Sequence, residues 1–235
     1  MRGNRAQRCA VAVMAKAPRL GEVKTRLVPP LSAAEAVALS GSFIRDIANN
    51  ILAASEAAPI DGYVAYSPAG SAEAFTALLP PQIRLLPPRR SGLGASLYDA
   101  AEDLLADGYG AACLVNADSP TLPTAVLVEA ARALAAPGDR VVLGPADDGG
   151  YYLIGVKQPH RHLFEDIAWS TELVFRQTLA RAADLGLEIV TLPGWYDVDD
   201  IASLCRLAGE LRDPDHSGYA APHTAAFVRR LAPRL

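Results

Sequence analysis

The sequence predicts an α/β protein of three layers, in which a mostly parallel central sheet lies between two layers of helices. Two observations predict this fold class. Apolar runs too short for helices alternate along the chain with longer segments whose apolar residues recur at helical spacing. The 235 residues are 51% apolar and 20% charged, which suits a globular protein with a substantial core.

The first half of the chain opens with a short buried strand and a basic loop. Ser32 and Glu35 then form a capping-box pattern at the start of a helix whose apolar face repeats every three to four residues. In chain order, the expected elements of this half are a strand over 9–15, a helix over 32–51, strands over 61–68 and 82–87, a helix over 93–104 and a strand over 111–118.

The second half continues the alternation, so the strands are expected to be mostly parallel. Right-handed crossovers then bring the carboxyl ends of parallel strands to one edge of the sheet, where open α/β sheets bind ligands. The expected elements here are a helix over 123–134, strands over 139–145 and 151–156, a helix that Ser170 and Thr171 start and Gly186 ends, a strand over 187–193 and a helix over 199–211.

Composition limits the partners and the domain count. We expect one domain over 1–212 and a tail over 213–235 that carries a short docked helix. The net charge of −4, from 22 basic and 26 acidic residues, gives no general field that would recruit nucleic acid. No run approaches the ~20 apolar residues of a membrane helix. The three cysteines show no paired spacing, and we expect reduced thiols and a cytoplasmic location.

A basic loop follows the first strand, in the stretch "AKAPRLGEVKTRL". Its four basic residues face only one acidic residue, and Gly21 would let backbone N–H groups approach a ligand. Charge-assisted hydrogen bonds to phosphate oxygens make such a loop a candidate phosphate site. Taken alone, however, this loop is better explained as a solvated basic turn. The candidate substrate-binding residues here are Lys16, Arg19, Gly21, Lys24 and Arg26.

Carboxylates follow two of the expected strands. Asp118 ends the run "CLVNADSPTLP", and Asp197 and Asp199 lie in "WYDVDDI". Mg²⁺ binds carboxylate oxygens and keeps substrate phosphates and waters as its other ligands, so one or two carboxylates suffice. Asp118 could instead help to start the next helix, and Asp199 could be only a helix N-cap.

Two further stretches carry polar groups at the predicted edge. "GPADDGGYYLIG" places Asp148, Gly149, Gly150 and Tyr151 between strands, although Asp-Gly is also a hairpin signal. In "IAWSTELVF", the helix that begins at Ser170 and Thr171 could hold a phosphate or carboxylate at its N-terminus, and helix capping alone also explains them.

Taken in order, the motifs resemble one bacterial family. "KAPRLGEVKTRL", "LGASL", "NADSPTLP", "VVLGPADDGGYYLIGV", "IAWST" and "WYDVDD" are similar to the glycosyltransferases associated with radical-SAM and selenodomain proteins. The resemblance covers roughly residues 10–211. Such proteins look like nucleotide-diphosphosugar transferases of the GT-A type, with a Rossmann-like α/β/α sandwich. They are also similar to nucleotidylyltransferases such as 2-phospholactate guanylyltransferase and molybdenum cofactor guanylyltransferase.

The resemblance implies roles for particular residues. Lys24 and Arg26 would contact nucleotide phosphates. Asp118 would bind the metal, with Asp197 or Asp199 as the second metal-side carboxylate. Asp148, Gly149 and Gly150 would form part of an acceptor or phosphate pocket. This chain has Asn116 in a triplet that in the family commonly reads Gly-Ser/Thr-Asp, which places Asn116 at the donor site.

The function that we expect is a metal-dependent transferase acting on a nucleotide-activated donor, most simply a glycosyltransferase that uses a nucleotide sugar, a small-molecule acceptor and Mg²⁺ or Mn²⁺. Lys24 would stabilise charge on the leaving group, and Asp148 would be the general base. One alternative is a nucleotidylyltransferase that transfers a nucleotide to a phosphorylated small molecule and releases pyrophosphate. Another is a non-catalytic nucleotide-binding module. The sequence leaves open the base, the sugar, the acceptor, the stereochemistry and the oligomeric state.

Overall fold

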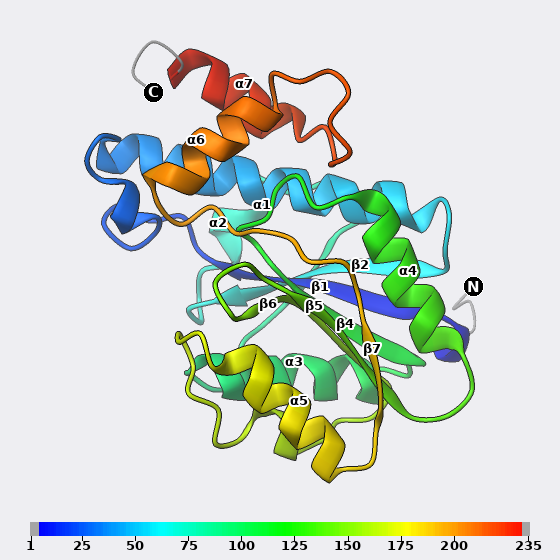
Figure 1. The fold of residues 1–235 in the computed structure, drawn as a ribbon. Helices are drawn as coiled ribbons and strands as arrows, with labels where there is room; N and C mark the ends of the chain where they lie inside the picture. Colours follow the sequence, from blue (N-terminus) through cyan, green and yellow to red (C-terminus); the bar gives the residue numbers. More distant parts are fainter. Residues whose placement is uncertain (1–4, 232–235) are drawn as a thin grey trace.

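A computed structural model describes residues 5–231 and confirms the predicted fold class. A seven-stranded sheet in the order β3-β2-β1-β4-β6-β5-β7 lies between two layers of helices (Figure 1). Only β6 runs antiparallel to its neighbours. The strands are β1 (Cys9–Lys16), β2 (Ile60–Ser67), β3 (Arg84–Leu86), β4 (Ala111–Asn116), β5 (Arg140–Pro145), β6 (Tyr151–Val156) and β7 (Glu188–Thr191).

The helices cover both faces of the sheet because each presents an apolar stripe to it. Figure 1 shows α1 and α4 on one face and α3 and α5 on the other. The helices are α1 (Ala33–Ser55), α2 (Ala72–Thr76), α3 (Leu93–Ala106), α4 (Thr124–Ala135), α5 (Val174–Asp184), α6 (Ile201–Glu210) and α7 (Pro222–Leu231), with 3₁₀ turns η1 (Arg5–Gln7), η2 (Thr25–Leu27) and η3 (Arg161–Phe164).

The start of α1 confirms the predicted capping box. The Ser32 hydroxyl accepts from the Glu35 backbone N–H at 3.2 Å, and the Ser32 N–H donates to the Glu35 carboxylate at 2.7 Å. Two backbone donors that have no partner inside the helix are therefore satisfied.

One predicted helix start, at Ser170 and Thr171, and one alternative, Asp199 as a helix N-cap, were wrong. Ser170 and Thr171 do not start α5, which begins at Val174. Ser170 has a φ of 64°, which is incompatible with a right-handed helix, and the Thr171 hydroxyl donates to the Ala168 carbonyl in a local turn. The cap of α6 is Asp200, whose carboxylate accepts from the Ser203 N–H at 2.8 Å, so Asp199 is left for other contacts.

The strand order brings distant segments to one edge. β1 and β4 are parallel neighbours, and the strands that follow them, β2 and β5, lie toward opposite ends of the strand order, which creates a switch point at the carboxyl ends of β1 and β4. Because β6 is antiparallel to β4, its first residue, Tyr151, lies at that same edge. The turn over 146–150 between β5 and β6 lies there too. This topology collects the polar stretches that the sequence singled out.

Beyond α1, the helices α6 and α7 form a further layer (Figure 1). The N-terminus of α7 is capped from α1, because the buried Asp46 carboxylate accepts the N–H of His223 at 3.1 Å and of Thr224 at 2.7 Å. Pro222 occupies the first helical position, where no N–H is needed. The division at residue 212 stays a prediction, and residues 1–4 and 232–235 of the two predicted ranges lie outside the described residues.

The described residues, 5–231, contain no helix that is long and apolar enough to cross a bilayer.

We predict that Asp46→Ala lowers the free energy of unfolding by about 1–3 kcal/mol, since two N–H groups at the start of α7 lose their acceptor. Urea denaturation measures the change, and limited proteolysis should cut first near α7. Ser42→Ala, on the same helix with a hydroxyl bonded only within α1, should change stability by less than about 0.5 kcal/mol. Equal stability of the two variants would contradict the proposed capping role.

Candidate functional site

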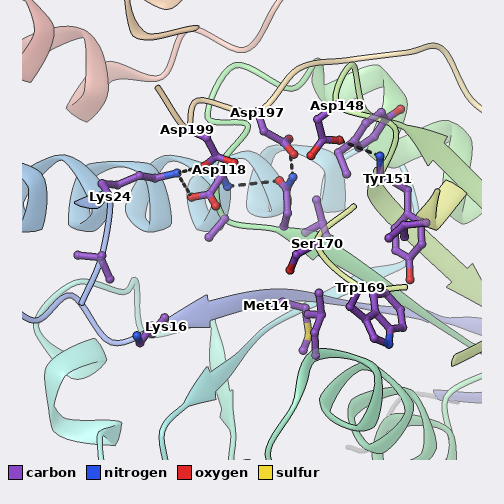
Figure 2. A pocket seen from close by; sticks show the side chains of 18 of the residues that line it. Met14, Lys16, Lys24, Asp118, Asp148, Tyr151, Trp169, Ser170, Asp197 and Asp199 are labelled. Atoms are coloured by element: carbon purple, nitrogen blue, oxygen red, sulfur yellow. Dashed lines mark hydrogen bonds and ion pairs between the residues drawn. The ribbon is translucent and has the colours of Figure 1, made fainter. Parts of the chain in front are cut away.

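A cavity of about 720 Å³ lies beyond the carboxyl ends of β1 and β4 (Figure 2). Twelve of the predicted site residues line it: Lys16, Lys24, Arg26, Asn116, Asp118, Asp148, Gly150, Tyr151, Ser170, Thr171, Asp197 and Asp199. They come from strand ends and loops far apart in the sequence. The structure therefore brings these residues together at one edge of the sheet, whereas their roles stay predictions.

Three predicted site residues do not line this cavity. Arg19 and Gly21 lie on the exposed outer part of the basic loop. Gly149 packs on the Glu172 backbone, where a Cβ would lie 2.5 Å from the Glu172 carbonyl oxygen, and its own carbonyl accepts the Phe175 N–H. Gly149 thus closes the turn against the segment before α5 rather than facing a ligand.

Lys24 joins the basic loop to the carboxylates. Its side chain is only 5% exposed, and its ammonium lies 2.6 Å from Asp118 Oδ1 and 3.0 Å from Asp199 Oδ1. Burial opposes the charge, but the two carboxylates outweigh it and raise the pKa of Lys24 above its ordinary value. Lys24 also has a φ of 48°, the left-handed region that bulky residues rarely adopt. The ammonium group of Lys24 is therefore fixed between two candidate metal ligands, Asp118 and Asp199.

Asn116 positions the third carboxylate. Its amide donates to Asp197 Oδ1 at 2.6 Å, and the Ser119 hydroxyl donates to the same oxygen at 2.6 Å. The Asn116 carbonyl oxygen also accepts the Asp118 N–H at 3.3 Å. Asn116 thus holds Asp197 and the loop that carries Asp118 in a fixed relation, a contact that the sequence did not predict.

Asp197 is an unusually basic carboxylate. Burial, together with the nearby charges of Asp118 and Asp148, raises its pKa to about 6, although the hydrogen bonds from Ser119 and Asn116 act in the opposite direction. Negative charge is therefore concentrated at this point of the cavity. A cation placed there would relieve it.

Backbone hydrogen bonds set the distance between the two acidic segments. The Val198 N–H donates to the Asp118 carbonyl at 2.9 Å. Upstream, the chain that follows β7 continues along β5. The Trp195 N–H donates to the Pro145 carbonyl, and the Asp147 N–H donates to the Trp195 carbonyl, both at 3.1 Å. The segment 192–198 is thus bound along its length before it delivers Asp197 and Asp199.

The turn between β5 and β6 is both a hairpin and part of the site. Asp148 Oδ1 accepts the Gly150 N–H at 2.8 Å, which stabilises the turn. Figure 2 shows Asp148 between Asp197 and Tyr151. Asp148 therefore both stabilises the hairpin turn and lines the cavity.

Several cavity residues were not predicted from the sequence. They include Met14, Glu22, Leu93, Leu97, Trp169 and Glu172. All but Met14 lie within the motifs quoted above, although none was named as a candidate site residue. A second cavity of about 560 Å³ adjoins the first and shares Met14, Lys16 and Leu93 with it. Its further walls come from the ends of β2 and β3, the residues that follow them and the start of α3, including Tyr66, Pro68, Arg89, Arg90 and Ser96. The paired arginines after a strand were the signal that could have identified it.

Among residues 5–231, no group of three or more His, Cys, Asp or Glu side chains is arranged to hold a metal ion unaided. Asp118 and Asp199 share Lys24, and Asp197 is turned toward Asn116 and Ser119. Any ion here would need ligands from a substrate.

Comparison with known proteins places this geometry in context. A family described as "Uncharacterized protein conserved in bacteria (DUF2064)" matches residues 50–171, more than half of the chain. A crystal structure from Desulfovibrio desulfuricans G20, provisionally described as a nucleotide-diphospho-sugar transferase, is 28% identical in sequence. The alignment covers 94% of this chain and 97% of that one, with a TM-score of 0.79.

More distant structures share the fold alone. CMP:2-keto-3-deoxy-manno-octonic acid synthetase complexed with CTP is 11% identical over 85% of this chain and 96% of that one, with a TM-score of 0.55. The 4-diphosphocytidyl-2C-methyl-D-erythritol synthase of Anaerococcus prevotii DSM 20548 is 9% identical over 88% of this chain and 100% of that one, with a TM-score of 0.56. No curated protein matches the chain.

We predict that ionisation of Asp197 costs the folded protein stability. Its pKa is raised from 3.8 to about 6, so the folded state favours the protonated form. As pH rises from about 4 to about 7, the wild type should lose about 1–3 kcal/mol of unfolding free energy relative to Asp197→Asn, which cannot ionise. Urea denaturation in metal-free buffer at several pH values measures this difference. The same comparison for Asp107→Asn, at the opposite edge of the sheet, is the control. If the stability of the wild type relative to Asp197→Asn stays constant or increases as pH rises, the prediction is wrong.

Proposed function

The chain belongs to the DUF2064 family of uncharacterized bacterial proteins, and we propose that it is a metal-dependent glycosyltransferase that uses a nucleotide sugar as donor. One observation carries the proposal. A buried ammonium from a basic loop meets carboxylates from the end of β4 and from the segment before α6, in a cavity at the switch point of an α/β sheet. The likeness to a protein provisionally described as a nucleotide-diphospho-sugar transferase supports the choice of donor.

The donor diphosphate would lie against the basic loop. Lys16, Lys24 and Arg26 all line the cavity, and phosphate oxygens make strong charge-assisted hydrogen bonds with such groups. Negative charge that develops on the departing diphosphate would be stabilised by these fixed cations. Lys24 is well suited to this role because its buried ion pairs keep it protonated.

The carboxylates fit a hard divalent cation such as Mg²⁺ or Mn²⁺. Asp118 and Asp199 line the cavity, their side chains are 39% and 46% exposed, and both offer oxygen ligands. Mg²⁺ is commonly held by one or two carboxylates together with substrate phosphates, which agrees with a set of ligands that is incomplete without substrate. Asp118, with Asp199 or Asp197, would hold the ion. When bound, it would supply further positive charge for the diphosphate.

The second cavity would take the nucleoside. It opens into the first beside Lys16, is walled by Tyr66, Pro68 and Pro87, and is large enough for a base and ribose. A diphosphate at the basic loop would then link a nucleoside on one side to a sugar on the other.

The acceptor would react at the opposite side of the sugar. An acceptor hydroxyl attacks the anomeric carbon, the bond from that carbon to the diphosphate oxygen breaks, and a nucleoside diphosphate leaves. Asp148 would accept the hydroxyl proton, provided that the bound acceptor lies within hydrogen-bond distance. In the alternative nucleotidyl transfer, a phosphorylated acceptor attacks the α-phosphate of a nucleoside triphosphate and pyrophosphate leaves.

The experiment that tests the proposal incubates the protein with Mg²⁺, a panel of nucleotide sugars, a panel of nucleoside triphosphates and a mixture of small acceptors. We expect nucleoside diphosphate to be released from one nucleotide sugar. Release of pyrophosphate from a triphosphate would replace the proposal with nucleotidyl transfer. Binding of nucleotides without turnover of any donor would indicate a non-catalytic module.

We predict that Asp118→Ala weakens Mg²⁺-dependent nucleotide binding at least tenfold, because the ion loses a ligand. Calorimetric titration with and without Mg²⁺ measures this, and circular dichroism checks the fold. Asp147→Ala is the matched control, since Asp147 lies on the neighbouring turn, pairs with Arg206 and does not line the cavity. If Asp118→Ala keeps its full Mg²⁺-dependent affinity, the metal role of Asp118 is wrong.

A further inference from the structure

We propose that the acceptor of this enzyme is neutral or cationic and carries an apolar face, and that phosphorylated acceptors are excluded. The inference rests on the proposed function and concerns one part of the same cavity, which we call the acceptor end. It is formed by Asp148, Tyr151, Trp169 and Glu172. Figure 2 shows Tyr151 and Trp169 at the side of the cavity away from Lys16 and Lys24.

Positive and negative side chains are segregated along the cavity. Its basic residues, Lys16, Lys24 and Arg26, come from the last residue of β1 and the loop that follows it. Two of them are already engaged. Lys24 pairs with Asp118 and Asp199, and Lys16 lies 3.7 Å from a Glu22 carboxylate oxygen. Little positive charge therefore extends toward the acceptor end.

The acceptor end offers only negative charge. Within residues 5–231, no lysine, arginine or histidine lies within 4.0 Å of the carboxylates of Asp148, Glu172 or Asp197. Asp197 is instead stabilised by the neutral groups of Asn116 and Ser119. A phosphate monoester placed here would meet like charges and no ion-pair partner, which disfavours it strongly.

The opposite wall of the acceptor end is aromatic and apolar. The rings of Tyr151 and Trp169 meet edge to face, with centroids 6.4 Å apart and planes at 81°. Gly94 allows this arrangement, because a Cβ at that position would lie 2.5 Å from the Trp169 indole nitrogen. Leu97, which belongs to the same apolar cluster as Trp169, also lines the cavity.

Aromatic rings beside carboxylates recognise particular chemistry. Ring faces pack against apolar C–H surfaces and attract cations, while the carboxylates accept hydrogen bonds from hydroxyl or ammonium groups. An acceptor with hydroxyl or amine groups on one side and an apolar face on the other satisfies both walls. The diphosphate of the donor, in contrast, would stay at the basic end of the cavity.

The local charge can be measured at Trp169 without knowing the substrate. The chain has two tryptophans, so Trp195→Phe makes Trp169 the sole indole. Its fluorescence is titrated with caesium, iodide and neutral acrylamide at constant ionic strength, and each quenching constant is divided by that of free N-acetyltryptophanamide. We expect the normalised constant for caesium to exceed that for iodide at least twofold. Iodide quenching that equals or exceeds caesium quenching would overturn the proposal.

A charge-neutralising variant makes the test specific. In the same background, Asp148→Asn with Glu172→Gln should bring the ratio of caesium to iodide quenching toward one. The matched control, Asp107→Asn with Glu188→Gln, removes the same charge at the opposite edge of the sheet and should leave the ratio unchanged. An unchanged ratio in the first variant would overturn the assignment of the charge to the acceptor end.

A transfer assay distinguishes failure of this inference from failure of the proposed function. With the donor from the panel, acceptors are offered in pairs: glycerol and glycerol 3-phosphate, glucose and glucose 6-phosphate, 2-aminoethanol and phosphoethanolamine. We expect each unphosphorylated member to be used at least tenfold faster wherever a pair is used. Preference for the phosphorylated members would overturn the inference while leaving glycosyl transfer intact. If no nucleotide sugar in the panel serves as a donor, the proposed function is overturned, whereas the quenching result still defines the charge of the cavity.

Discussion

The buried ammonium of Lys24 is the constraint on which the site depends. It neutralises part of the charge of Asp118 and Asp199, which come from two strand ends and would otherwise repel each other and Asp197. It also ties the basic loop to the edge of the sheet, because its third contact is the Val198 carbonyl at 2.8 Å. One side chain in a left-handed backbone conformation thus fixes the loop, the acidic cluster and the orientation of the cavity between them.

Segregation of charge gives the cavity a direction. Cations gather after β1, carboxylates gather where β4 and the 192–198 segment meet, and aromatic rings follow at β6 and before α5. The cations, the carboxylates and the aromatic rings are each held by a different element at one edge of the sheet. The order of charge along the cavity therefore follows from the strand order rather than from any single loop. A substrate with a charged part and an uncharged part can therefore bind in only one orientation without a cost in electrostatic energy.

Much of this arrangement could be predicted from the sequence, because apolar periodicity locates strands and strand ends locate the edge. The fold class, the capping box at Ser32 and the meeting of Asp118 with Asp197 and Asp199 followed from that reasoning. The direction of side chains within a loop could not be predicted in this way. For this reason Arg19 and Gly21 were expected in the cavity, and Trp169 was not. The start of α5 was missed because serine and threonine stabilise tight turns as readily as helix ends, and φ decides between them.

The distance between the two acidic segments is set by main-chain groups. The Val198 N–H on the Asp118 carbonyl, and the bonds of Trp195 and Asp147 upstream, involve no side chain. Substitutions in these stretches therefore leave the spacing intact provided that the backbone conformation is kept. The orientation of the Asp197 carboxylate, in contrast, depends on the side chains of Asn116 and Ser119. Substitution of these two residues would therefore redirect a carboxylate while the backbone bonds keep the two segments together.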